Sequence, residues 1–357
     1  TNCLTSTWMK SIGLVWFNRC SICYCNLRQY LKEELFDKIG IDHKHIKWIR
    51  TPDGYEVAGG GMLATTEDNL RLMDLYRKDG IWEGERILSH DFVELATTKR
   101  IETRGFSPNC DEAVDHLLGY GFQIWMCQPE GSYRADGAFG QYSIVFPKQD
   151  LIISLTETTR KEDDGAQYPL DAIYPILDEI RDEALELNEE DWGKLKNKMR
   201  SLALPNPPFR PYSPVMEKIQ DSRWVTKNGE FFYTPYHRDL LAGKEIPCSI
   251  LELQLKFVDG GLNLSLQTEC GEEFISVPMD GSRGYFVAPY REIPFRKVYS
   301  HGYWESEDIL CLNFRWIESA YEKTIRMQFD DPFMNIFSED LISFINLPCE
   351  DAVAVRE

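Results

Sequence analysis

Hydrophobic and polar residues alternate in several runs of the last third of the chain. Residues 251–257 place apolar side chains at every second position, and residues 262–266 repeat the pattern after an Asp-Gly-Gly turn. Further alternating runs end at Trp316 and Phe329. Because the side chains of a strand point alternately to its two faces, such runs predict strands with one buried face. We therefore expect an all-β antiparallel sandwich or barrel in this region.

Earlier in the chain the apolar residues recur at helical spacing. This pattern predicts a short amphipathic helix over residues 27–39, a second helix capped by Thr66 and a third that is capped by Ser89. Two more helices are expected over residues 168–187 and 189–202.

Three short strands are predicted between these helices. Residues 119–125, 133–141 and 144–154 are joined by tight glycine turns or by a Pro-Lys-Gln-Asp turn. Helices combined with consecutive, closely spaced strands are typical of an α+β fold with an antiparallel sheet.

A change of composition separates the two kinds of pattern. Residues 204–214 contain five prolines in eleven positions, which disfavours helix and central strand and is typical of a stiff linker. We expect the chain to divide into an unassigned N-terminal segment over residues 1–26, an α+β domain over 27–203, the Pro-rich linker over 204–214, a β-domain over 215–346 and a tail over 347–357.

The composition of the chain makes some classes of binding partner unexpected. The chain has 357 residues, enough for two domains, and a formal charge of -19 at pH 7. Nucleic acids and anionic membranes are bound by clustered Lys and Arg, so neither is an expected partner. The sequence has no run of 18 apolar residues and no charged start followed by a long apolar stretch. It therefore encodes neither a membrane span nor a signal peptide.

The ten cysteines are spread along the chain without the spacing of a disulfide framework. Free buried thiols in a reducing compartment are the simpler interpretation, which favours a cytoplasmic location. Cys20, Cys23 and Cys25 form a C-x2-C-x-C cluster, and His43 and His45 downstream are residues of the kind that bind zinc. No second C-x2-C pair accompanies the cluster, so we expect no metal, and the lack of a Gly-rich phosphate loop predicts no cofactor.

Six signals follow one another in a fixed order from about residue 27 to residue 180. They are a helix ending in LFDKIGI, a run of three glycines, and the segments TTEDNLRLMDLY, GYGFQIW, ADGAFGQ and DLIISLTE, with a helix after the last. In this order they resemble the C-terminal half of the serine β-lactamase and penicillin-binding-protein superfamily. The resemblance implies a partial β-lactamase/transpeptidase-like domain, and the family's N-terminal half would lie before Thr1.

The family resemblance implies a serine hydrolase that cuts an ester, amide or peptide bond through an acyl-enzyme. In the family a Ser-x-x-Lys helix supplies nucleophile and base, because residues three apart share one helix face. No serine of this chain has a lysine three positions on, and Thr7 with Lys10 keeps the spacing only outside any predicted helix. We therefore expect a truncated chain that is inactive as written. The alternative is a non-catalytic binding or interaction protein that retains the hydrolase cleft and the β-domain.

The family's Y-x-N motif has one match in letters. Tyr24 and Asn26 flank Cys25, which makes Tyr24 and Asn26 the catalytic candidates of the chain. Only three residues separate this tripeptide from the next helix signal at Tyr30, where the family has a helix of several turns. A chance match or a deletion explains this spacing.

The family's Lys-Thr-Gly or His-x-Gly motif aligns with Ala135, Asp136 and Gly137, so the glycine is kept and the cation is missing. Arg134 is the nearest cation, but neighbouring residues on a strand point to opposite faces. Asp136 would make the cleft acidic, which fits an esterase or peptidase better than a β-lactamase. The substrate-binding candidates are Gly60, Gly61, Arg134, Ala135, Asp136, Gly137 and Gln141.

The expected partner is a small-molecule or peptide substrate. Half of a mixed sheet also leaves an unpaired strand edge, so pairing with another chain through this edge is a further expectation. For the same reason we expect poor solubility for residues 1–202 alone.

Overall fold

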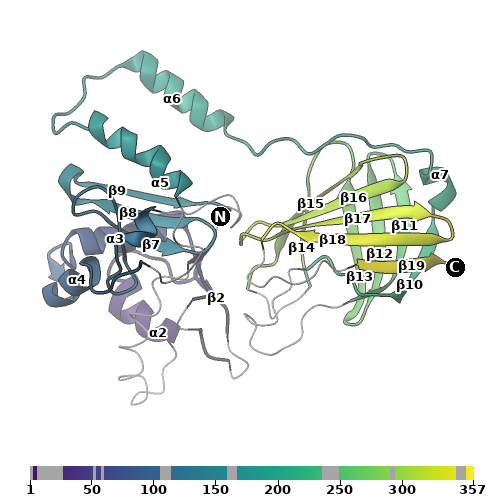
Figure 1. Cartoon of the computed structure of the whole chain (residues 1–357), viewed down its shortest axis with the longest axis horizontal. Coiled ribbons are helices and arrows are strands. Elements are labelled where there is room, and N and C mark those ends of the chain that lie inside the picture. Colours follow the sequence, from purple (N-terminus) through teal and green to yellow (C-terminus); the bar gives the residue numbers. More distant parts are fainter. Residues whose placement is uncertain are drawn as a thin grey trace.

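The computed structural model describes residues 3–5, 27–50, 54–57, 60–104, 114–158, 167–234, 249–289, 294–342 and 351–357. They form an α+β part and a large antiparallel β-barrel, which Figure 1 shows side by side. The predicted fold class is confirmed, and of the two architectures left open for the last third the structure has the barrel.

Caps and periodicity predict most of the helices, with some different ends, but not the short helix at Met216–Ile219. α3 (Thr66–Arg77) begins with a capping box in which Asp68 N donates to Thr65 Oγ1 at 3.1 Å, so Thr65 and not Thr66 is the cap. Ser89 caps α4 (His90–Thr97) as expected. The other helices are α2 (Leu27–Leu31), α5 (Tyr168–Ile173), α6 (Glu189–Ser201) and α7 (Met216–Ile219).

Short tighter or wider helical turns extend these elements. A π-helical turn, η1 (Lys32–Phe36), continues α2, and the 3-10 turn η5 (Tyr174–Glu179) continues α5. Pro175 predicts a kink in the helix expected over residues 168–187, and the helix does tighten there, at Tyr174. The expected length is wrong, because the helical turns end at Glu179. Two further 3-10 turns are η2 (Val114–Leu117) and η3 (Pro147–Gln149).

A four-stranded antiparallel sheet organises the α+β part. Its order is β6 (Trp125–Met126), β7 (Tyr133–Gly137), β8 (Gln141–Phe146) and β9 (Leu151–Thr156). α3 packs on β8 and β9, and the opposite face carries an apolar cluster shared with α5 and η5. Every residue of β8 is buried, because helices cover both faces of the sheet.

Smaller sheets complete this part. β3 (Met62–Ala64) lies between β1 (Cys3–Thr5) and β2 (Lys47–Trp48), and β4 (Ile81–Trp82) pairs with β5 (Glu85–Arg86). The expected strand over residues 119–125 is mostly wrong, because β6 starts only at Trp125.

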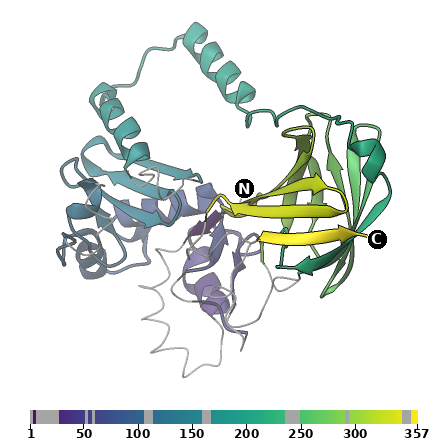
Figure 2. The same cartoon turned by 45° about the vertical axis from the view of Figure 1, so that its right-hand side comes forward.

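The barrel is built from ten strands. Along the ladder they are ordered β13-β12-β11-β10-β19-β18-β17-β16-β15-β14, and Figure 2 shows them curving around one interior. The end strands β13 and β14 lie against each other. Gly284 of β14 packs so closely on Pro278 of β13 that a Cβ at Gly284 would lie 2.7 Å from Pro278 Cδ. The strands are β10 (Ser222–Asn228), β11 (Ile250–Val258), β12 (Gly261–Thr268), β13 (Gly271–Pro278), β14 (Gly284–Val287), β15 (Lys297–Trp304), β16 (Ile309–Trp316), β17 (Glu322–Asp330), β18 (Phe333–Asp340) and β19 (Asp351–Arg356).

Two expectations for this region are corrected. The predicted tail over residues 347–357 contains β19, which pairs with both β10 and β18 and so belongs to the barrel wall. Cys270 is disulfide-bonded, so the expectation of free thiols does not hold there, whereas Cys127 and Cys311 are free and buried.

Inward-facing side chains fill the barrel. Trp224, Trp304 and Trp316 are each at most 1% exposed and belong to one apolar cluster with leucines from β11, β12 and β16. The barrel therefore has a packed core along the faces that alternation predicted, except at Leu251, which is 44% exposed beside a register shift in β11.

Side chains of the α+β part pack against this barrel core. Ile49 and Leu63 belong to the same buried cluster, and Phe139, in the turn between β7 and β8, packs against it. Lys47 Nζ lies 2.6 Å from Oε1 of Glu318, which follows β16. The barrel thus contacts the turn that follows the Ala-Asp-Gly strand.

Candidate functional site

The strand β7 offers a partly open edge. Its partner β8 covers its whole length, from Tyr133↔Val145 to Gly137↔Gln141, whereas β6 pairs only with Tyr133 and Arg134. On the β6 side, the strand pairing with β6 ends at Arg134, and Gly137 has no strand pairing there among the residues that the structure describes. An extended ligand backbone can pair with such an edge, and Gly137 has no side chain to obstruct it.

The Ala-Asp-Gly strand divides its side chains between two faces. Ala135 is 3% exposed and belongs to the apolar cluster on the α3 side, whereas Arg134 and Asp136 face the side covered by α5. The position that carries a cation in the resembled family is therefore an alanine in an apolar environment. Arg134 lies on the other face.

Arg134 is wholly buried and fixed by several partners. Its Nε donates to Asp136 Oδ2 at 2.9 Å, and its Nη1 donates to Met126 O at 2.9 Å and contacts Cys127 Sγ at 3.7 Å. Burial lowers the pKa of the guanidinium, but the carboxylate of Asp136 and other neighbours more than offset this, so the pKa lies above its usual value. Arg134 is a structural cation, and its burial argues against direct contact with a substrate.

Asp115 in η2 is the centre of this buried network. Its carboxylate accepts hydrogen bonds from Gln128 N at 2.9 Å, from Gln128 Nε2 at 2.7 Å and from Gln167 Nε2 at 2.8 Å, and also from the Tyr174 hydroxyl. Arg134 Nη1 lies 3.9 Å away. The network joins the end of β6 to α5 and η5, and burial raises the pKa of Tyr174.

His116 and Asp136 form the more accessible end of the same network. His116 Nε2 lies 3.3 Å from Asp136 Oδ2, and the two side chains are 16% and 12% exposed. The His116 ring lies 4.6 Å from that of Trp125, which also contacts Tyr120. A histidine beside a carboxylate can hold or pass a proton. The pair of His116 and Asp136 therefore gives this part of β7 a group with acid-base capacity.

Gln141 is the first residue of β8 and pairs with Gly137 at the end of β7. Its Nε2 donates to Glu157 O at 2.8 Å, but Gln141 Oε1 and Glu157 Oε1 are buried without a hydrogen-bond partner among the described residues. Burial raises the pKa of Glu157. Gly140 packs so closely on Glu157 that a Cβ there would lie 2.2 Å from Glu157 Cγ.

The remaining candidates are distributed as follows. Gly61 has a φ of +76° and a hydrogen bond from Ile49 N to its carbonyl oxygen, and a Cβ would lie 2.8 Å from Ile49 Cβ, so its role is close backbone packing. Gly60 precedes it and is half-buried. Tyr24 and Asn26 lie outside the described residues, as do Cys20, Cys23 and Cys25.

The described residues contain neither a cluster of metal ligands nor a helix that could span a membrane. Within the described ranges, no three His, Cys, Asp or Glu side chains gather as a metal site would require. None of the helices in the described part is long and apolar enough to cross a membrane.

The network of Asp115, His116, Gln167 and Tyr174 was not predicted from the sequence. Asp115 and Gln167 are 52 positions apart, and Asp115 and Tyr174 are 59 positions apart. No motif connects residues at these separations. The sequence gives one indication of this network: its polar residues stand among apolar neighbours, and polar residues that are buried in this way need hydrogen-bond partners.

No protein-family model matches the chain. Two curated relatives match it, the "Uncharacterized protein MT1414" and the "Protein Rv1367c" of two Mycobacterium tuberculosis strains. Each is 29% identical over 123 residues, which cover 29% of this chain and 29% of the relative. The chain thus spans less than a third of the length of these relatives.

Solved structures give low similarity. A 6-aminohexanoate-dimer hydrolase from Bacillus anthracis has a TM-score of 0.36 at 19% identity, over 48% of this chain and 43% of that one. The octameric penicillin-binding protein homologue from Pyrococcus abyssi has a TM-score of 0.30 at 12% identity, over 92% and 60%. A fatty acid binding protein from Schistosoma mansoni has a TM-score of 0.25 at 10% identity, over 31% and 72%. At these TM-scores no likeness carries an argument about function.

Proposed function

We propose that the chain is a relative of the β-lactamase and penicillin-binding-protein hydrolases that, as this polypeptide, does not catalyse acyl transfer. The ordered signals of the sequence fall on α3, β7, β8 and β9 in one α+β part, which supports the relationship. The observation that carries the proposal is the position of the glycine of the motif, Gly137, at the end of β7, beyond the point where the pairing with β6 stops. We propose the Pro-rich segment 204–214 as the boundary between the two domains.

Acyl transfer needs a nucleophile, a base and donors for the oxyanion. The chain has no Ser-x-x-Lys and no G-x-S-x-G, so neither familiar way of activating a serine is present in it. The His116–Asp136 pair could act on a proton, but a proton acceptor without a positioned nucleophile does not form an acyl-enzyme. We propose that the chain can still bind a ligand at the edge of β7, although it does not form an acyl-enzyme.

The charges around the edge support a neutral ligand. A ligand carboxylate would need an accessible cation, but position 135 is an alanine and Arg134 is bonded to Asp136 out of reach of solvent. Asp136 itself adds negative charge near Gly137. We therefore propose a neutral ester, amide or peptide as the ligand class rather than a carboxylate-bearing β-lactam.

A turnover assay tests this proposal. The chain would be incubated with p-nitrophenyl esters of increasing acyl length and with nitrocefin, next to an active serine β-lactamase. The expected result is no product above that of a heat-denatured sample. Saturable turnover that tracks the folded protein would contradict it.

A second candidate is a binding or interaction protein in which the barrel is the working part. Phe139 ties the β7–β8 turn to the barrel core, and Lys47 pairs with the buried Glu318, so the barrel adjoins the former catalytic sheet. A ligand that binds the full chain with unchanged affinity after Gly137→Val, a substitution at the edge, would favour this candidate. Loss of binding in that variant would favour the edge.

A further inference from the structure

The Pro-rich segment before α7 runs along the outer face of the barrel, as Figure 1 shows. Trp304 N donates to Arg210 O at 2.9 Å, and the Arg283 guanidinium donates to Pro205 O. These bonds hold the segment against β15 and the turn before β14. Between residues 204–208 and the barrel wall lies a cavity of about 340 Å³, a size common for small-ligand sites.

The floor of this cavity consists of outward-facing residues from three neighbouring strands. His301 of β15 is opposite Asn313 of β16, which is opposite Thr324 of β17. The next row contributes Arg315, opposite Glu322. Outward positions of a barrel ordinarily face water, yet Asn313 is only 8% exposed. The segment has converted part of the outer wall into a partly covered groove.

The charges of the lining favour an anion. Arg283 and Arg315 contribute two cations, whereas Glu322 is the single carboxylate of the lining and already accepts a hydrogen bond from Asn313 Nδ2 at 2.9 Å. Burial, and then the charge of Arg283, lower the pKa of His301, so its ring is neutral near pH 7. The lining therefore has a net positive charge, whereas the whole chain has a formal charge of -19.

The same lining offers apolar surface. Pro205, Pro207 and Pro208 form one wall, and the rings of His301 and Tyr303, stacked at 6.3 Å, belong to the other. Of the five donors of each guanidinium, Arg315 uses Nε for Glu322 at 3.5 Å and Arg283 uses one nitrogen for Pro205. These are the partners of the two guanidinium groups among the described residues, so donors remain for a further acceptor beside an apolar wall.

We propose that this cavity binds a small organic carboxylate, with the carboxylate on Arg283 and Arg315 and an apolar ring or chain between the prolines and Tyr303. The site is independent of the proposed hydrolase relationship, because none of its residues belongs to the β7 edge.

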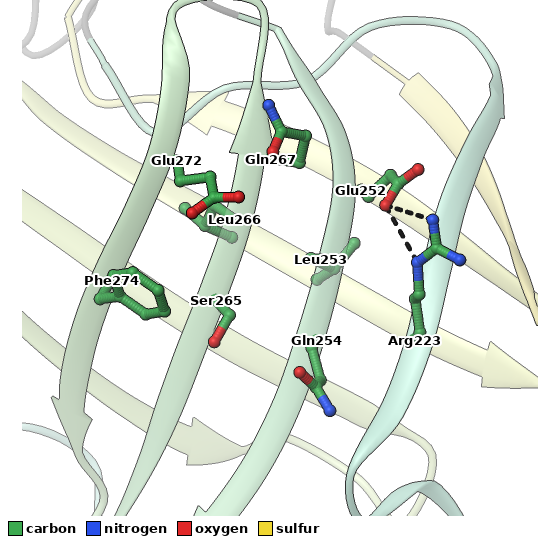
Figure 3. A pocket seen from close by; sticks show the side chains of 9 residues that line it. All are labelled: Arg223, Glu252, Leu253, Gln254, Ser265, Leu266, Gln267, Glu272 and Phe274. Carbon is green, nitrogen blue, oxygen red and sulfur yellow. Dashed lines mark hydrogen bonds and ion pairs between the residues drawn. The ribbon is translucent and has the colours of Figure 1, made fainter.

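A second hollow on the barrel lacks these properties. Figure 3 shows Arg223 of β10 held by Glu252, with hydrogen-bond distances of 2.9 and 2.5 Å, and Glu272 and the exposed Phe274 on β13 across the two strands between. Its lining comes from β10 to β13 and consists of outward-facing residues apart from the buried Leu253 and Leu266, with two carboxylates for one cation. It is therefore a solvated sheet surface, and the contrast shows what the Pro-rich segment adds.

The test is calorimetric titration of the full chain with benzoate, with benzamide as the uncharged match and inorganic phosphate as an anion without an apolar body. We expect saturable one-to-one binding of benzoate and much weaker binding of the other two. Arg315→Gln should weaken benzoate binding about tenfold or more, because it removes a charge-assisted hydrogen bond. Arg326→Gln is the control, since Arg326 lies on the same face and is 32% exposed, against 34% for Arg315.

Three results would overturn the proposal: no saturable binding of benzoate, equal binding of benzamide or phosphate, or an equal loss in the Arg315 and Arg326 variants. Circular dichroism melts would show that each variant is folded. If Arg315→Gln does not fold, Arg283→Gln gives the same comparison. Failure of this test leaves the turnover assay unaffected, because the two sites share no residue.

Discussion

The barrel and the four-stranded sheet bury polar groups in opposite ways. In the barrel, alternation sends most charged side chains outward and fills the interior with residues such as Trp304 and Leu312. The sheet instead buries Arg134 and Asp115 on the face covered by α5. A core of the first kind can be predicted from periodicity, whereas one of the second kind depends on partners that only the fold brings together.

The largest expected loss of stability comes from a substitution in the buried polar network of the sheet. Asp115→Ala removes the acceptor for Gln128, Gln167 and Tyr174 and leaves Arg134 with one fewer carboxylate nearby. We expect a loss of about 3–5 kcal/mol in the free energy of unfolding, measured by urea denaturation. Asp182→Ala, at an exposed position, is the control. A loss below about 1 kcal/mol would mean that the network contributes little to stability.

The apolar core gives the next largest effect. Leu312→Ala removes a side chain that is 1% exposed and leaves a cavity among tightly packed neighbours, so we expect a loss of about 3 kcal/mol. Leu251→Ala in the same barrel should cost far less, because Leu251 is 44% exposed. Equal losses in the two variants, measured by the same denaturation, would contradict the filled-barrel description.

A smaller effect is expected where the two parts meet. Burial raises the pKa of Glu318, but Lys47, the backbone N–H of Arg296 and Lys297 lower it more, so the folded pKa lies below the ordinary value. The pair therefore stabilises the fold above the ordinary glutamate pKa, and this contribution is lost as the pH falls through the folded pKa. Lys47→Met should cost about 1–2 kcal/mol at neutral pH and less in acid.

Thermal unfolding of Lys47→Met across the acid range checks this expectation. Lys44→Met, at an exposed position four residues from Trp48, is the matched control. A destabilisation of Lys47→Met that does not change with pH would show that the charge of Glu318 is not involved.

The smallest expected effect is a gain. Because burial raises the pKa of Glu157, the folded chain keeps a proton that the unfolded chain has lost between the ordinary pKa and the folded pKa. Stability therefore falls as the pH rises through this window and stays lower at neutral pH. Glu157→Gln should raise the melting temperature by a few degrees at pH 7 and have almost no effect near about pH 4. Glu130→Gln is the exposed control, and an equal rise at both pH values would contradict the explanation.

The comparison also explains what could be predicted from the sequence. β11 and β12 follow directly from their alternating residues, and α3 follows from its apolar spacing and the acidic first turn. β19 was missed because its small residues give little contrast, although both of its neighbours pair with it. β6 was overextended because a positive φ of 63° at Gln123 interrupts the strand.

The site was predictable only in part. Residues 135–137 could be aligned by motif, and strand alternation put Ala135 and Arg134 on opposite faces in advance. The buried surroundings of Arg134 could not be predicted, because Asp115 lies on a separate turn and is itself bonded to Tyr174, 59 positions further along the chain. The covered cavity on the barrel could not be predicted either, because a proline-rich sequence does not specify the surface on which it lies.

The most direct test of the central claim is the intact mass of the chain after incubation with a fluorophosphonate and, separately, with a penicillin. The account predicts the unmodified mass in both cases, because no serine of this chain has a lysine three positions on. A stoichiometric adduct on one serine of the folded protein, absent after denaturation, would contradict it and show that the chain has an activated serine nucleophile.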